Sequence, residues 1–301
     1  MHVEFDQNEK MVRRFMESSF EHEQVAMESI DPEFKRMVSG WHEDFAENHA
    51  EKARFVGRRF RNWGDLLDAC RSAWGEGIDT IQQMVDEIKN ETMPKPKSRK
   101  RRGAWSSEEG DEFDLDRLQR GKPYWRTTQR ESASGAQEVT ILVQVGGNCG
   151  TSSLDLLWQG AAAIAVAEIL EEVGFQVQLL GASRTERSWI AKVKGKQQIV
   201  GHVDVIELKK SGDVIDRSSL ANAVSGWHYR TIHFADAARK RPAPGVVVTE
   251  VRTGLGHSES LTSGDIEFAT MAKPFVIQDC YSRREATDKA KRILNNIAQA
   301  D

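Results

Sequence analysis

Residues 139–182, VTILVQVGGNCGTSSLDLLWQGAAAIAVAEILEEVGFQVQLLGA, decide the fold of this chain. The mostly apolar run at 139–145 is typical of a buried strand. A glycine-rich turn leads into an apolar helix, with Ser153 as its expected N-cap and Gly174 at its end, and residues 175–180 supply the next strand. This order of strand, helix and strand predicts a parallel pair joined by a right-handed crossover.

The rest of the C-terminal half continues to alternate between strands and helices. The apolar patterns predict strands and helices in the following places: strands at 189–193, 199–207, 229–234, 245–251 and 274–278, and helices at 218–225 and 283–298. Such alternation favours an α/β fold with a three-layer, open and mostly parallel sheet. We assign this domain to residues 114–301.

Residues 1–92 are predicted to form a helical N-terminal segment. Phe15, Met16 and Phe20 have helical spacing near the start. Further along, residues 80–89 place several apolar side chains on one helix face: Ile81, Met84, Val85 and Ile88.

Residues 93–113 are predicted to be a charged linker, because two prolines interrupt them and apolar periodicity disappears. A basic cluster comes first: Lys95, Lys97, Arg99, Lys100, Arg101 and Arg102. This cluster could bind the phosphates of a nucleic acid. Alternatively it is a solvated tether, partly neutralised by the acidic residues that follow: Glu108, Glu109, Asp111 and Glu112.

The composition favours a cytoplasmic protein with no membrane partner. The 301 residues carry a formal net charge of -4, which gives no overall attraction to nucleic acid. No run of about 18 apolar residues is present. The three cysteines, Cys70, Cys149 and Cys280, are too far apart in sequence for a C-x-x-C metal site, and we expect reduced thiols.

The turn at 146–153 is the first candidate site, because ligands in open α/β sheets bind beyond the carboxyl ends of the strands. A nucleotide-binding loop would require the spacing G-x-G-x-x-G, or a lysine after the glycines. Gly147 and Gly150 have a different spacing, and no lysine follows them. The turn therefore does not fit a nucleotide loop.

The block at 139–182 resembles the opening of a von Willebrand factor A domain, in which a buried strand leads to a D-x-S-x-S metal loop and an alanine-rich helix. The resemblance implies a Mg²⁺ site with oxygen ligands from this loop and from two later loops. It places Asn148, Gly150 and Ser152 at the three loop positions. Ser218 or Ser219 would stand near the family's threonine, and Thr249 or Glu250 near its last aspartate.

Two of the loop residues differ from the family pattern. Asn148 replaces a charged carboxylate and Gly150 removes a hydroxyl, so we expect a degenerate metal site and no cofactor. Two alternatives remain open. One is a Mg²⁺-dependent adhesion or phosphate-binding domain or enzyme, and the other is a purely structural turn in which Asn148 takes a left-handed conformation.

Other candidates for chemistry are scattered. His257 lies in a loop rich in glycine and hydroxyl groups, TGLGHSESLTSGD, that could contact a ligand. Cys149 precedes a helix, where the pKa of a thiol can fall, but no histidine or aspartate partner is near in sequence. We therefore predict no catalytic residue and no metal ligand.

The segments WGDLLDACRSAWGEGIDTI and DLDRLQRGKPYW, in this order, also resemble proteins of tailed bacteriophages and prophages that carry no known activity. For a phage-encoded chain, the resemblance implies a place in the host cytoplasm or in the virion. We expect a non-catalytic protein-binding or assembly module, with a protein partner or self-assembly and with nucleic acid, through residues 95–102, as an alternative partner. The expected binding loop comprises Asn148, Thr151, Ser152, Ser153, Ser218, Ser219 and His257.

Overall fold

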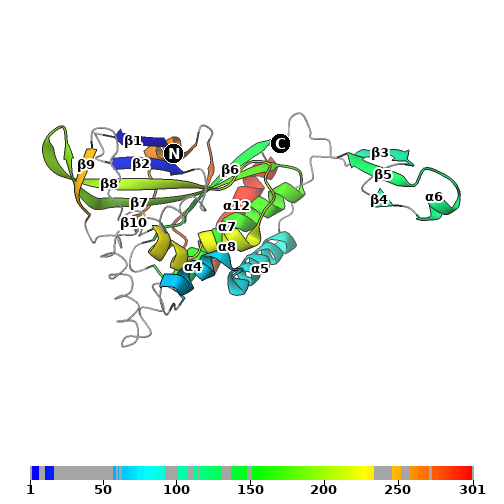
Figure 1. Ribbon diagram of the computed structural model, residues 1–301, viewed down its shortest axis with the longest axis horizontal. Helices are drawn as coiled ribbons and strands as arrows, with labels where there is room; N and C mark the ends of the chain where they lie inside the picture. The colour runs from blue at the N-terminus through cyan, green and yellow to red at the C-terminus, as the bar shows by residue number, and fades with distance from the viewer. Residues whose placement is uncertain are drawn as a thin grey trace.

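The computed structural model describes residues 2–6, 11–16, 57–58, 60, 63–91, 101–107, 112–113, 115–129, 137–147, 151–233, 246–251, 258–270 and 273–299. These residues form a mixed α/β structure in which one open, mixed sheet packs against helices (Figure 1).

The predicted strand, helix and strand form the centre of the sheet. Strand β6 (Glu138–Gln144) leads into helix α7 (Ser153–Glu172), and strand β7 (Gln176–Val193) follows. β6 and β7 are parallel, with Ile141 opposite Leu179. Gly174, at a φ of 100°, ends the helix in the left-handed region that glycine adopts without strain. The predicted parallel pair is confirmed.

The sheet is mixed rather than mostly parallel. β7 forms an antiparallel hairpin with β8 (Lys196–Lys209) through a two-residue turn in which Lys194 and Gly195 both have positive φ, as a type I′ turn requires. Strands β9 (Val246–Val251) and β10 (Ser258–Glu259) are also antiparallel to β7. A hairpin cannot be parallel, and this short turn therefore sets the direction of β8.

The prediction of an N-terminal helical segment is wrong for the first described residues. β1 (His2–Asp6) and β2 (Met11–Met16) form an antiparallel pair, and β2 extends the sheet by pairing in parallel with β8. Arg14 of β2 forms a buried bidentate ion pair with Asp204 of β8, at 2.5 and 2.6 Å. The pairing partners are about 190 residues apart in sequence, so local spacing gives no sign of it.

The other neighbour of β6 is β11 (Phe275–Ile277), which is parallel to it and leads to the last helix, α12 (Arg283–Gln299). The main strand order is β1-β2-β8-β7-β6-β11. The predicted strand at 274–278 and helix at 283–298 are confirmed in place, and the Ser282 hydroxyl caps α12 by accepting from the N–H of Glu285 at 3.2 Å.

Residues 229–233 are not the strand that their alternation predicted. They form the short π-helix η2 (Tyr229–His233), which continues directly from α9 (Gly226–His228) after α8 (Arg217–Ala223). Trp227 and Tyr229 are both buried, and Trp227 packs against Phe60 and Trp74. This tertiary packing overrides the local alternation.

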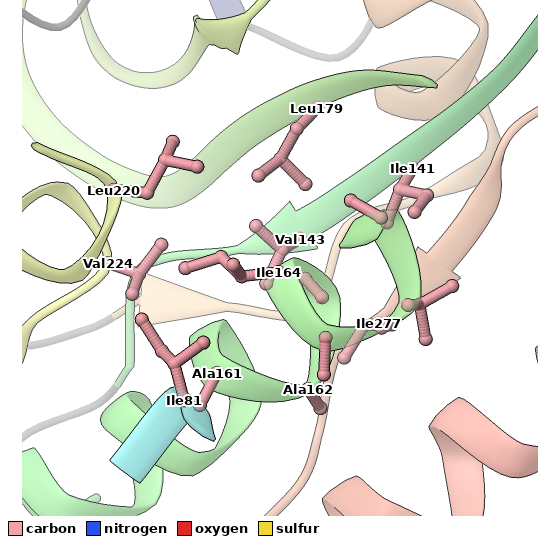
Figure 2. Packing of buried hydrophobic residues seen from close by; sticks show 14 of the residues in the cluster. Ile81, Ile141, Val143, Ala161, Ala162, Ile164, Leu179, Leu220, Val224 and Ile277 are labelled. Carbon is pink, nitrogen blue, oxygen red and sulfur yellow. The ribbon is translucent and has the colours of Figure 1, made fainter. Parts of the chain in front are cut away.

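Helix α7 is the core helix of the structure. It contacts β6, β7, α8, α12 and helix α5 (Gly75–Glu91), which follows α4 (Trp63–Arg71). Figure 2 shows Ile164 of α7 among apolar side chains of the sheet, such as Val143. Among the described helices α7 is long and apolar enough to cross a membrane, but 78% of its apolar window is buried in the structure, as in a core helix.

Part of the predicted linker forms a second, small sheet. Its strands are β3 (Arg101–Ser106), β5 (Trp125–Gln129) and β4 (Glu112–Phe113), with the short helix α6 (Leu115–Gln119) between β4 and β5. Figure 1 shows this small sheet extending away from the main body. We call the described residues of 101–129 the arm.

The close approach of α7 and α8 gives the first testable prediction. A methyl group on Gly160 of α7 would overlap with the side chain of Val224, which follows α8. Gly160→Ala should therefore lower the free energy of unfolding by about 1–3 kcal/mol, measured by urea denaturation. Gly75→Ala is the matched control, because no atom lies within 4 Å of its added methyl group. Equal stability of the two variants would contradict this helix contact.

Candidate functional site

A cleft of about 400 Å³ lies beyond the carboxyl ends of β6 and β11, beside the start of α7. Its walls come from β6, β7, α7 and the segments around β10 and β11. The lining residues are mostly polar: Gln144, Gly146, Gly147, Thr151, Leu156, Gln159, Arg184, Glu186, Glu259, Ser260, Thr262, Asp279, Cys280 and Tyr281. The cleft thus lies where ligands collect in open α/β sheets.

The amino end of α7 forms one side of the cleft. Ser152, not the expected Ser153, is the N-cap: its hydroxyl accepts from the N–H of Asp155 at 3.1 Å and donates to the Asp155 carboxylate at 2.6 Å. The Asp155 carboxylate also accepts from the N–H of Ser152 at 3.2 Å. This capping box satisfies the helix end and commits the Ser152 hydroxyl to it.

Two glutamines join the strand ends at the floor of the cleft. Gln159, a buried residue of α7, donates to the carbonyl of Gln144 and accepts from the N–H of Cys280 at 2.9 Å. The Gln144 amide donates to the carbonyl of Glu259 at 3.0 Å and accepts from the N–H of Asp279 at 3.3 Å. These bonds hold β6, β10 and the end of β11 in fixed relative positions.

Asp279 is the residue that sequence reasoning missed. It follows β11 with a φ of 58°, a left-handed conformation that is uncommon outside glycine but tolerated by aspartate. Its carboxylate accepts from the Ser260 hydroxyl at 2.6 Å. The sequence held a usable signal, since Asp279 comes directly after a predicted strand and before the helix at 283.

The residues expected near the last aspartate of the family lie elsewhere. Thr249 and Glu250 are in β9, which pairs with the far part of β7, where Glu250 lies opposite Ile190. The strand beside β6 is β11 instead. The expectation for Thr249 or Glu250 is therefore corrected, because strand order along the sheet differs from strand order along the chain.

Ser218 and Ser219 also lie away from the cleft. Their backbone N–H groups donate to the carboxylate of Asp216, which caps α8. The neighbouring Arg217 forms an ion pair with Glu168 at 2.5 Å, 15 residues into α7 and thus about 22 Å along the helix from its start. The expectation that these serines stand beside the loop is corrected. The later segment that meets it is Gly226, next to Ser153.

The remaining expected residues divide into three groups. Thr151 lines the cleft. Arg101 and Arg102 belong to β3 of the arm. The others lie outside the described residues: Asn148, His257, Lys95, Lys97, Arg99 and Lys100.

A buried charge network supports the wall of the cleft formed by β7. Arg184 of β7 donates to Asp265 at 2.6 Å and to Glu186 at 3.1 Å, and Arg13 of β2 donates to the same Asp265 at 3.2 Å. Asp265 belongs to helix α11 (Ser263–Ala269) and also accepts from the hydroxyl and N–H of Thr262. Arg184, the one cation among the described lining residues, is thus already paired.

The thiol at the cleft is not an activated nucleophile. Burial raises the pKa of Cys280 to about 11, so it stays protonated near neutral pH. Nor does the part of the chain that the structure describes contain a group of three or more histidine, cysteine, aspartate or glutamate side chains placed to hold a metal ion.

Asp265 yields a prediction that depends on pH. Burial alone would raise the pKa of Asp265, but hydrogen bonds from Thr262 and Arg184 outweigh it and lower the pKa. The ionised carboxylate therefore stabilises the fold above the ordinary aspartate pKa of about 3.9, and this contribution is lost as the pH falls through the lowered value. Asp265→Asn should cost about 3 kcal/mol at pH 7 and progressively less at pH 3 and below.

Urea denaturation at the two pH values measures this difference. Asp288→Asn is the control, because Asp288 is exposed and its ion pair with Arg284 is 3.8 Å long. Its effect should stay below about 0.5 kcal/mol at either pH. If Asp265→Asn lowers the free energy of unfolding equally at both pH values, the packing of Asp265, and not its charge, stabilises the fold.

A family model described as a domain of unknown function (DUF7192) matches residues 4–301. No curated protein and no solved structure matches the chain significantly. Because the family model covers almost the whole sequence, this chain belongs to the DUF7192 family.

Proposed function

We propose that the chain is a non-catalytic protein-binding or assembly module, built on a von Willebrand factor A-like domain with a degenerate metal site. The cleft is its recognition surface. The observation that carries the proposal is the position of Asp279, which follows the strand beside β6 and lines the same cleft as Thr151 of the first loop. The resemblance implies a late aspartate in such a position. The order of segments further suggests a bacteriophage context.

The residues available to bind a metal ion support the proposal that the metal site is degenerate. Mg²⁺ requires a near-octahedral shell of oxygen ligands, usually with one or two carboxylates. Here Asp279 is the one such carboxylate that lines the cleft close to the first loop; it accepts one hydrogen bond from Ser260 and keeps a second oxygen, whereas the Ser152 hydroxyl is used in the capping box. At the first two loop positions, Asn148 has an amide in place of a carboxylate, and Gly150 has no side chain. This set of donors does not fit Mg²⁺ well.

The walls of the cleft support a binding role. Hydrogen bonds of Gln144 and Gln159 and the ion pairs of Asp265 fix its shape before any ligand arrives. Preorganised walls reduce the entropy lost on binding. Its lining also lacks a histidine among the described residues, and its thiol is protonated near neutral pH.

A metal titration tests the proposal on the full chain. Thermal shift and calorimetry with Mg²⁺ and Mn²⁺ should show no saturable binding by the natural chain. Asn148→Asp should create a site, because it restores the carboxylate that the family has there. Adding Asp279→Asn to Asn148→Asp should remove that site again, whereas adding Asp288→Asn should not.

The two contrary outcomes are distinct. Saturable binding by the natural chain that Asp279→Asn abolishes would favour a Mg²⁺-dependent domain. If Asn148→Asp binds no metal, or binds it regardless of Asp279, the proposed correspondence with the family is wrong.

A further inference from the structure

The tip of the arm is strongly basic. Residues 117–126, RLQRGKPYWR, contain four basic side chains and no acidic one. Over the whole segment 101–129 the charges balance, with six basic and six acidic residues. The positive charge is therefore local to the tip at 117–126.

The tip presents its charges on an ordered turn. Gly121 has a φ of 64°, and the N–H groups of Gly121 and Lys122 donate to the carbonyls of Leu118 and Arg117 at 3.0 Å. Arg117 donates in turn to the carbonyl of Pro123 at 2.8 Å. Arg120 and Lys122 lie on either side of Gly121, and both are exposed. Little conformational freedom of this backbone would be lost on binding.

The charge of the cleft is opposite to that of the tip. Among the described lining residues, Glu186, Glu259 and Asp279 carry negative charge, and Arg184 carries the one positive charge. Arg184 is paired with Asp265 and Glu186, and Arg13 is paired with the same Asp265. The cleft thus favours a cationic occupant over an anionic one.

The arm and the cleft lie at opposite ends of strand β6. The arm ends at Gln129 and is followed by the amino end of β6, which starts at Glu138, whereas the cleft lies beyond the carboxyl ends of β6 and β11. Figure 1 shows the arm extending away from the body. A contact between tip and cleft therefore joins two copies.

We propose that the arm tip of one copy binds in the cleft of the next, with Arg120 and Lys122 facing Glu186, Glu259 and Asp279. This head-to-tail assembly rests on the proposed role of the cleft as a recognition surface. Such a contact between two different surfaces leaves one free tip and one free cleft, so it extends into a ring or a filament.

The arm favours a protein over a nucleic acid as its partner. Leu115 and Leu118 of α6 are 56% and 41% exposed, next to the basic tip. The rings of Tyr124 and Trp125 lie close together just beyond the turn, with centroids 6.2 Å apart and planes tilted by 45°. Aromatic and arginine side chains are enriched in protein interfaces. Exposed leucines contribute nothing to binding phosphates.

Charge reversal on the full chain tests this assembly by light scattering after gel filtration, and by sedimentation, over a range of protein and salt concentrations. The natural chain should self-associate at low salt and dissociate as salt rises. Arg120→Glu with Lys122→Glu should weaken association by about tenfold or more, and Glu186→Lys with Glu259→Lys should do the same. Thermal melting checks that each variant is folded.

Mixing the two variants is the decisive measurement. Each variant alone should associate about tenfold or more weakly than the natural chain. The mixture should regain association, because the reversed tip of one variant meets the reversed cleft of the other, and the natural tip meets the natural cleft. Lys196→Glu with Lys210→Glu is the matched control: both lysines are exposed, lie outside the arm, and give the same change in net charge. This control should assemble like the natural chain.

Three results would overturn the inference: a natural chain that stays monomeric at low salt, association that survives reversal of the tip, or a mixture that stays monomeric. Binding of a labelled oligonucleotide that is lost with Arg120→Glu and Lys122→Glu, in a chain that does not self-associate, would assign the arm to nucleic acid instead. The metal response of Asn148→Asp is independent of assembly, so the proposed domain and the proposed assembly can fail separately.

Discussion

The cleft depends on one buried amide. Gln159 is 2% exposed inside the core helix α7, and a buried polar group without partners costs about 1–3 kcal/mol. Its amide nitrogen donates to the end of β6 and its amide oxygen accepts from Cys280, just after β11. Both bonds form only when these two parallel strands end side by side next to α7. The loops that line the cleft therefore start from fixed positions.

The N-terminal strand is tied to this cleft through charge. Arg13 and Arg14 are adjacent in β2, so their side chains point to opposite faces of the sheet, one to Asp265 and the other to Asp204. A buried charge is tolerated only when it is paired, and a shift of β2 by one residue would exchange the two faces. The two ion pairs thus fix the register of a strand that joins the sheet from a distant part of the chain. Since Asp265 also holds Arg184, the same constraint reaches the cleft wall.

Local hydrophobic periodicity predicted the helices and strands whose packing partners are near in sequence. β6, α7 and β7 follow one another, and α5 and α12 each show an apolar face of helical period, so these elements could be located from the sequence. Long-range pairing could not be predicted in this way. β2 joins β8, the arm pairs residues of β3 and β5 that are 19 to 28 positions apart, and η2 forms where Trp227 and Tyr229 are buried. For Asp279 the local pattern gave its position at the end of a strand, but its place beside the first loop depends on the spatial order of the strands.

The proposed loss of metal ligands and the proposed assembly have one electrostatic basis. Replacing a carboxylate by Asn148 weakens an octahedral site, but it does not remove the negative charge that Glu186, Glu259 and Asp279 bring to the cleft. Among the described lining residues the one cation, Arg184, is already paired with Asp265 and Glu186. A lysine or arginine from another protein can balance the negative charge without a fixed coordination number. The arm of a second copy offers two such side chains on a rigid turn, and the field that attracts them would repel a nucleic acid.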